Sequence, residues 1–221
     1  MIVPAFELMS INWRIQPTSY GTRTTFVKAA LRPESAVALA VLMLLLGGGL
    51  ACSSKSNLPD YGAVPDFHLI DSYGRAFASA KELKGDVWVA DFIYTNCPGP
   101  CPRMTSIMHQ LQKKVVDDQD VRLVSISVDP DRDTPAVMAA YAKNFQAPMA
   151  DWFFLTGDRA TIHLLAHDVF HVGDLISVMD HSTHFVLVDK RCHIRGYYST
   201  FGADDMPKLF TDLRQLRKES A

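Results

Sequence analysis

The sequence has little net charge, few cysteines, no visible internal repeat and no glycine-rich phosphate loop. A formal net charge of −2 over 221 residues does not indicate a nucleic-acid-binding surface. The four cysteines are too few for a disulfide scaffold. What remains is a globular composition, with 48% hydrophobic residues, and a length that suits about one domain once an N-terminal segment is set aside.

Two of the cysteines, Cys97 and Cys101, lie close together with a Pro-Gly-Pro stretch between them. The apolar run Val87–Tyr94 before them predicts a buried strand, and Met104–Lys114 after them has helical spacing. We therefore expect both thiols on a strand-to-helix turn, with Pro102 at the first helical position and Cys101 at or beside the N-cap. A helix N-terminus favours thiolate over thiol, so the pair suits either a reversible disulfide or a soft metal such as Cu(I) or Zn.

The rest of the chain alternates predicted strands and helices. In the first part of the domain we expect a hairpin over 65–77 with its turn at Asp71–Gly74, a strand at Val121–Val128, and a helix capped by Thr134 with Pro135 at its first position. In the second part we expect a strand at Trp152–Leu155, a helix at Asp158–Val169, paired strands at Phe185–Val188 and Ile194–Tyr198, and a helix at Met206–Lys218. This order predicts an α/β fold with a central mixed β-sheet flanked by helices and an N-terminal β-hairpin. A dithiol on the first long strand-helix junction makes the predicted fold thioredoxin-like.

An apolar segment, Ala36–Cys52, precedes the predicted domain. It is short for a membrane-spanning helix and long enough for the core of a signal peptide. Its end, Gly49–Cys52, resembles a bacterial lipobox, although Gly49 stands where leucine is usual. We predict a leader over 1–35, a signal, lipoprotein or anchor segment over 36–52, a linker over 53–61 and one domain over 62–218. Lipidation of Cys52 is favoured over an uncleaved anchor, and both place the domain outside a bacterial cytoplasmic membrane, on the periplasmic or extracytoplasmic side.

Three stretches together resemble the SCO/SenC family of copper-binding, thioredoxin-fold proteins: Asp91–Pro102, Ser127–Pro135 and Asp180–Asp189. Two cysteines followed about 80 residues later by Asp-His-Ser and an apolar strand are a specific combination. The resemblance covers roughly residues 62–218. By match to the family's motif, the metal ligands would be Cys97, Cys101 and His181.

The resemblance implies a membrane-tethered copper metallochaperone rather than a turnover enzyme. Its cargo would be copper, as Cu(I), Cu(II) or both, because thiolates hold Cu(I) and an added imidazole suits Cu(II). Its implied partner is subunit II of cytochrome c oxidase, and other copper chaperones or thioredoxin-like reductants are further candidates. The alternative function is that of a thiol-disulfide oxidoreductase using Cys97 and Cys101, which could reduce the oxidase's copper-site cysteines. Peroxide reduction is a weaker third hypothesis, because no arginine suited to it is identifiable.

Several other polar residues have both a functional and a structural interpretation. We favour the structural one for His184 as a non-ligand, Cys192 as an unpaired exposed thiol, and Met104 and Met108 as core residues. The spacing of His163, His167 and His171 can chelate a metal on a helix, but a solvated helix face is favoured. The acidic cluster of Asp129, Asp131 and Asp133 suits a strand-to-helix loop better than a Ca²⁺ or catalytic site. Asp91, in the middle of a predicted buried strand, could tune the thiols' proton affinity.

Overall fold

The structure is a computed structural model that describes residues 56–147, 150–172 and 183–220. The predicted leader, the apolar segment over 36–52 and His181 lie outside the described residues. Within the described ranges, none of the helices combines the length and apolar character needed to cross a membrane.

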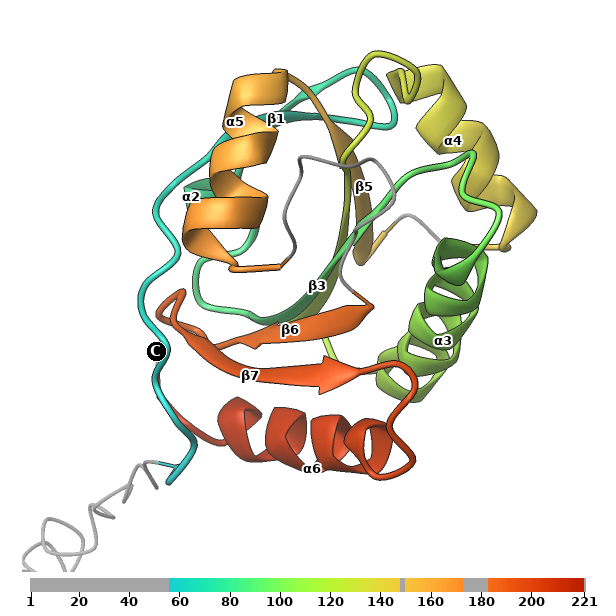
Figure 1. Ribbon diagram of the computed structural model, residues 1–221. Helices are drawn as coiled ribbons and strands as arrows, with labels where there is room; N and C mark the ends of the chain where they lie inside the picture. The colour runs from blue at the N-terminus through green and yellow to red at the C-terminus, as the bar shows by residue number, and fades with distance from the viewer. Residues whose placement is uncertain (1–55, 148–149, 173–182, 221) are drawn as a thin grey trace, which may run out of the picture. The chain divides into compact units, whose positions relative to one another are not determined.

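A seven-stranded mixed sheet forms the centre of the domain, in the order β2-β1-β5-β4-β3-β6-β7 (Figure 1). The strands are β1 (His68–Asp71), β2 (Ala76–Ala78), β3 (Val87–Ile93), β4 (Val121–Ser127), β5 (Trp152–Thr156), β6 (His184–Val188) and β7 (Ile194–Ser199). Pairing is parallel from β3 to β4 and from β4 to β5, and antiparallel elsewhere. The structure thus has the predicted mixed sheet and the predicted N-terminal hairpin, β1–β2.

Helices cover both faces of the sheet. They are α2 (Ser79–Glu82), α3 (Pro100–Val115), α4 (Pro135–Asn144), α5 (Arg159–His163) with the π-helix η1 (Leu164–Val169), and α6 (Asp205–Arg217). Apolar side chains of α3, α4 and α6 share one core with Val87 and Val89 of β3. Those of α5 and η1 share the other core with Trp88 and Phe92. Strand side chains alternate between faces, and β3 is buried along its whole length because both faces are covered.

Local sequence signals explain most element boundaries. The hairpin turn is closed by Asp71, whose Oδ1 accepts from the backbone N–H groups of Tyr73 (2.9 Å) and Arg75 (2.8 Å). Gly74 follows with a φ of 78°, a left-handed conformation that favours glycine. At α4 the predicted cap is confirmed, since the Thr134 hydroxyl accepts from the backbone N–H of Val137.

The predicted helix over 158–169 is only partly α-helical. Its second half is the π-helix η1, with an i→i+5 hydrogen bond from the Phe170 N–H to the Leu165 carbonyl (2.8 Å). Apolar periodicity predicts a helix there but does not separate these two helix types.

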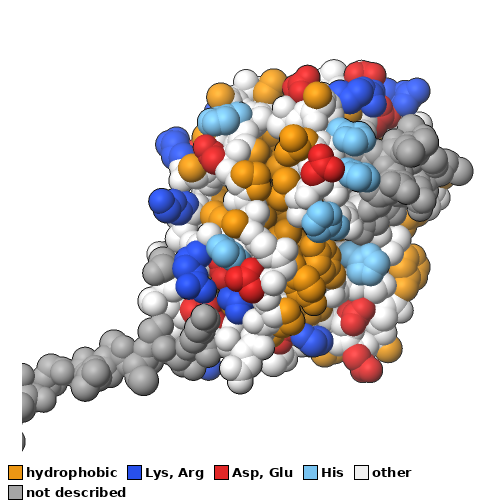
Figure 2. Space-filling model, turned by 60° about the vertical axis from the view of Figure 1, so that its left-hand side comes forward, with side chains coloured by type: hydrophobic (Ala, Val, Ile, Leu, Met, Phe, Trp, Pro, Cys, Tyr) orange, Lys and Arg blue, Asp and Glu red, His pale blue; other side chains and the backbone are white. Residues whose placement is uncertain are grey.

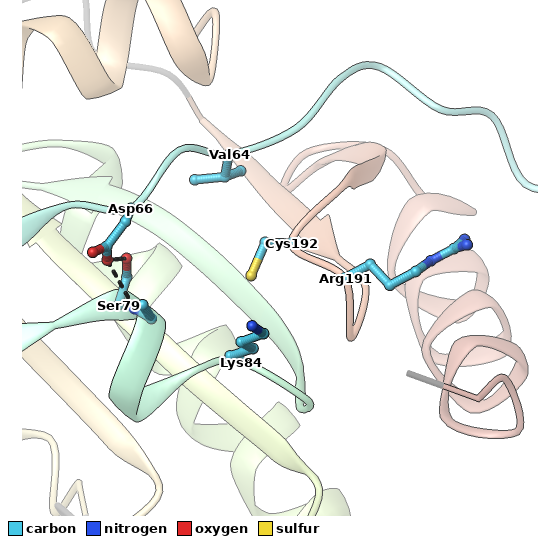
Figure 3. A pocket seen from close by; sticks show the side chains of 7 residues that line it. Val64, Asp66, Ser79, Lys84, Arg191 and Cys192 are labelled. Atoms are coloured by element: carbon cyan, nitrogen blue, oxygen red, sulfur yellow. Dashed lines mark hydrogen bonds between the residues drawn. The ribbon is translucent and has the colours of Figure 1, made fainter.

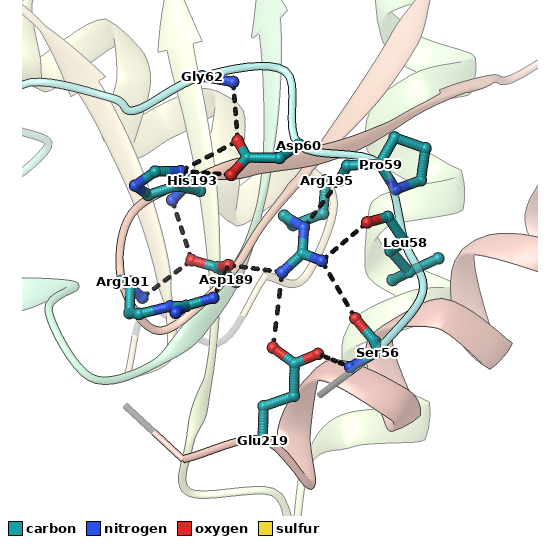
Figure 4. A network of polar contacts seen from close by, with 10 residues as sticks. All are labelled: Ser56, Leu58, Pro59, Asp60, Gly62, Asp189, Arg191, His193, Arg195 and Glu219. Atoms are coloured by element: carbon teal, nitrogen blue, oxygen red, sulfur yellow. Dashed lines mark hydrogen bonds and ion pairs between the residues drawn. The ribbon is translucent and has the colours of Figure 1, made fainter. Parts of the chain in front are cut away.

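Part of the predicted linker is bound to the domain. The buried guanidinium of Arg195, on β7, donates to the carbonyls of Pro59 (2.7 Å) and Leu58 (2.9 Å) and to the hydroxyl of Ser56 (3.1 Å) (Figure 4). Glu219, beyond α6, accepts from the Ser56 N–H and lies 3.5 Å from the same guanidinium. Residues 56–59 and the end of the chain are therefore attached to the β6–β7 hairpin through one arginine.

Candidate functional site

The two clustered cysteines lie where β3 leads into α3, as predicted. The helix begins two residues earlier than expected: Gly99 is its N-cap and Pro100, not Pro102, is at its first position. Cys101 therefore belongs to the first turn and Cys97 to the preceding loop. Pro100 and Pro102 both lack an N–H that the first turn would leave unpaired, so the sequence rule for the first helical position fits either proline. Both sulfurs are thiols in the structure, and their residues are 6% and 0% exposed, respectively.

Cys97 is the residue of the pair that the surroundings stabilise as a thiolate. Burial acts to raise the pKa of its thiol, but hydrogen bonds from the backbone N–H groups of Cys101 and Gly99, the Cys101 thiol and the Tyr94 hydroxyl outweigh it. The net result is a pKa below the usual range. These donors come from the N-cap and first turn of α3 and from the residue that follows β3, so the strand-to-helix turn itself creates the anion-stabilising environment.

Cys101 has the opposite character. Burial raises the pKa of its thiol strongly, and the neighbouring Cys97 sulfur and the charge of Asp91 raise it further, although the Tyr94 backbone opposes them. Tyr94 itself has a pKa raised to about 12, by burial and by its hydrogen bond to Cys97. The pair therefore consists of one sulfur poised as an anion and one buried sulfur that keeps its proton.

This asymmetry predicts selective alkylation. With limiting iodoacetamide near neutral pH, we expect Cys97 to react at least about tenfold faster than Cys101, since each unit of pKa difference changes the thiolate fraction about tenfold. Cys192 is the matched internal comparison, because its pKa is raised by burial and by Asp189. Peptide mass spectrometry over a time course would give the three rates. Equal rates at Cys97 and Cys101 would contradict the assignment.

Beneath the dithiol, a buried polar group connects β3, β4 and β5. The Ser125 hydroxyl donates to Asp91 Oδ1 (2.6 Å), and the indole N–H of Trp152 donates to the Ser125 hydroxyl (3.0 Å). Asp91 Oδ2 is buried and has no hydrogen-bond partner among the described residues. Burial raises the pKa of Asp91 to about 7, although the Ser125 hydrogen bond acts to lower it. Asp91 thus lies in the core, as its place in the strand predicted.

Asp133 supports the cysteine loop, a role that the sequence interpretation did not assign. Its Oδ2 accepts from the Thr95 N–H (3.0 Å) and the Ser127 hydroxyl (2.6 Å), and its Oδ1 accepts from the Thr95 hydroxyl. The available signal was topological: Thr95 and Asp133 both follow strands that are parallel neighbours, so their carboxyl ends meet at one edge. The other two acids of the cluster pair with arginines, Asp129 with Arg132 and Asp131 with Arg159, which agrees with the structural interpretation.

The third implied ligand, His181, lies outside the described residues, so the structure does not place it relative to the sulfurs. His184 begins β6 and is exposed. Among the residues that the structure describes, no group of three His, Cys, Asp or Glu side chains could hold a metal ion. Met104 and Met108 are fully buried in the core with α4 and α6, as the core-packing interpretation predicted.

Cys192 differs from its expected exposed state. It is half-buried at the β6–β7 turn, has a φ of 62°, and lines a pocket with Val64, Asp66, Ser79 and Lys84 (Figure 3). The neighbouring His193 is bound by Asp60, with Nδ1 3.0 Å from both carboxylate oxygens (Figure 4).

The fold and the dithiol define a class: a thioredoxin-like domain with a reactive cysteine pair at its first strand-helix junction. Within this class, the family model described as SCO1/SenC matches residues 56–216. The chain belongs to the SCO1/SenC family.

Individual relatives agree with this membership. The chain is 49% identical over 80 residues to the SCO1 protein homolog of Bacillus subtilis, covering 36% of this chain and 42% of that protein, less than half its length. A SCO1/SenC family lipoprotein from Bacillus anthracis is 32% identical with a TM-score of 0.67, covering 74% of this chain and 99% of that one.

Two further solved structures are informative. BsSco, described as having a disulfide switch and as a member of the Sco family of cytochrome c oxidase assembly proteins, is 30% identical with a TM-score of 0.62 (73% and 96% coverage). Bradyrhizobium japonicum ScoI, solved with copper bound, is 26% identical with a TM-score of 0.55 (70% and 99% coverage).

Proposed function

We propose that this protein is a copper metallochaperone that binds copper through Cys97, Cys101 and His181 and helps assemble the copper centre of cytochrome c oxidase subunit II. The observation that carries the proposal is a pair of neighbouring sulfurs, one in the first turn of α3 and one in the loop before it, with the loop sulfur stabilised as a thiolate, in a member of the SCO1/SenC family. The copper-bound relative from Bradyrhizobium and the oxidase-assembly description of BsSco support it.

The chemistry of the donor set fits transient copper binding. Thiolates are the ligands that Cu(I) prefers, and an imidazole makes the set suitable for Cu(II) too. Three protein ligands leave copper under-coordinated, so that it can pass to a partner site. Copper loading requires deprotonation of both sulfurs. The lowered pKa of Cys97 favours this step there, whereas Cys101 would release its proton to solvent as the cation takes the proton's place on the sulfur.

We further propose that the domain is tethered to the outer face of a bacterial cytoplasmic membrane, through lipidated Cys52 or an uncleaved segment over 36–52. The description of the Bacillus anthracis relative as a lipoprotein supports the tether. A tether would confine the chaperone to the surface that carries its acceptor and so raise the effective concentration. Other copper chaperones or thioredoxin-like reductants would load or reduce it.

A thiol-disulfide oxidoreductase is the second candidate, and the asymmetry of the cysteines favours it. A low-pKa Cys97 can attack a partner disulfide, and Cys101 can then resolve the mixed disulfide. In that reaction two thiols become one disulfide while the partner gains two electrons and two protons. The disulfide switch named for BsSco supports this chemistry.

Copper titration of the reduced protein separates the two functions. We expect one copper per chain by Cu(I) competition and by thiolate-to-copper absorption of Cu(II), with tight binding lost in Cys97→Ser and His181→Ala. His184→Ala is the matched control and should bind as the parent does. Absence of tight copper binding, together with disulfide reductase activity that is indifferent to His181→Ala, would contradict the chaperone and support the oxidoreductase.

A further inference from the structure

Three histidines lie along the exposed side of α5 and η1 and the residues that follow, apart from the cysteine site. His163 ends α5, His167 lies within η1, and His171 comes two residues after η1. All three are exposed. The face shown in Figure 2 carries a group of histidine side chains beside a band of hydrophobic ones. A repeat of one imidazole per helical turn brings metal-ligating groups together without help from other elements.

The rings of His163 and His167 are already arranged side by side. Their centroids are 5.6 Å apart and their planes differ by 19°. A cation bridging two imidazoles lies about 2.0–2.1 Å from each nitrogen, so the nitrogens must converge further. Both side chains are exposed, and rotation about χ2 of histidine has a broad, shallow profile, so small rotations can bring the nitrogens closer.

Hydrogen bonds assign the nitrogen that is available to a metal in two of the three rings, those of His167 and His171. His167 Nδ1–H donates to Asp168 Oδ1 (2.8 Å), which places the lone pair of the neutral ring on Nε2. His171 Nδ1–H donates to the His167 carbonyl (3.0 Å), with the same consequence. Metal-ligating histidines commonly donate their second ring N–H to a carboxylate or a backbone carbonyl, which orients the ring and makes it a better ligand. Here His167 donates to a carboxylate and His171 donates to a backbone carbonyl.

Asp168 also supplies negative charge at the right place. Its Oδ1 lies 2.8 Å from His167 Nδ1, and its side chain is 63% exposed. The carboxylate is thus held beside His167 and would partly neutralise a cation bound there. Because no group of three ligands within the described ranges converges on one point, water would complete the coordination.

We propose that His163 and His167 form a second, surface metal site, positioned by Asp168, that takes an exchangeable divalent cation of the imidazole-preferring class, Cu(II) or Zn(II). The site is independent of the cysteines and does not rest on the chaperone function. Imidazole nitrogen suits both ions, and Cu(II) forms the stronger complex of the two.

The test uses the full chain carrying Cys97→Ser, Cys101→Ser and His181→Gln, which removes the proposed dithiol site. Cupric ion is added and followed by electron paramagnetic resonance, with binding constants from competition against glycine. We expect Cu(II) bound through two nitrogens, loss of this species on adding His163→Gln or His167→Gln, and about tenfold weaker binding on adding Asp168→Asn.

His68→Gln is the matched control, because His68 is also exposed and lies 3.5 Å from a carboxylate, that of Asp66, but on β1. It should leave the Cu(II) species unchanged. The proposal is overturned if no two-nitrogen species forms, if it persists in both helix variants, or if His68→Gln removes it equally. Far-ultraviolet circular dichroism of each variant shows whether the fold is kept, so that loss of binding is not mistaken for unfolding.

Discussion

Replacing Arg195 with methionine is expected to lower the free energy of unfolding by about 3–5 kcal/mol, the range found when one partner of a buried ion pair is removed. The Arg195 guanidinium is 3% exposed and lies 2.8 Å from Asp189 Oδ2, which is equally buried. The substitution leaves this carboxylate without its closest cation. It also leaves the carbonyls of Leu58 and Pro59 without a donor, at a desolvation cost for each.

Arg191→Met is the matched control for that prediction. Arg191 approaches the same carboxylate, but its Nη2 is 3.8 Å from Asp189 Oδ2 and its side chain is 50% exposed. Exposed pairs contribute about 0–1 kcal/mol, so this variant should unfold close to the parent. Urea unfolding followed by the fluorescence of the buried Trp88 and Trp152 gives both values. Equal, small losses for the two arginine variants would show that the Arg195 network does not stabilise the domain.

The second large effect is expected from Asp91→Asn, and it depends on pH. Burial raises the pKa of Asp91 from 3.8 to about 7 in the folded protein. Between these values the native state holds a proton that the unfolded state has released, so the stability of the parent falls as pH rises from about 4 to about 7. A pKa difference of about three units changes the free energy of unfolding by roughly 4 kcal/mol. The parent has this stability in full below pH 4 and has lost it above pH 7.

Asparagine resembles the neutral carboxyl group and does not titrate. The variant should therefore match the parent near pH 4 and exceed its stability by up to about 4 kcal/mol at pH 8. Urea unfolding at a series of pH values measures this difference. Asp158→Asn provides a control of opposite sign, because the pKa of Asp158 is lowered by its hydrogen bonds to the Thr161 N–H and hydroxyl at the start of α5. A parent-minus-variant difference that does not change with pH would contradict the Asp91 prediction.

The same Asp91 variant tests an effect on the dithiol. The charge of Asp91 raises the pKa of Cys101, so its removal should lower that pKa and ease deprotonation of the second sulfur. Thiolate absorbance against pH measures the change. Unchanged cysteine pKa values and copper affinity would restrict Asp91 to a role in stability.

Local chemistry in the sequence was enough to predict the elements around the site. The run Val87–Tyr94 predicts β3 because apolar residues at most successive positions suit a strand that is buried on both faces. Thr134 and Pro135 predict the start of α4 because a side-chain oxygen and a fixed φ act within a few residues. The placement of Cys97 and Cys101 together at a strand-helix junction follows from their closeness in the sequence and from the apolar patterns on either side. These features depend on interactions over short distances along the chain.

Other features depend on contacts between distant parts of the chain, and only the tertiary structure decided them. The unequal character of the two sulfurs comes from how deeply each is buried and from donors on both sides of the loop. The support of Thr95 by Asp133 requires β3 and β4 to be parallel neighbours. The attachment of Ser56 to Arg195 joins residues 139 positions apart. Burial and such long-range hydrogen bonds are set by packing, whose pattern apolar periodicity does not specify.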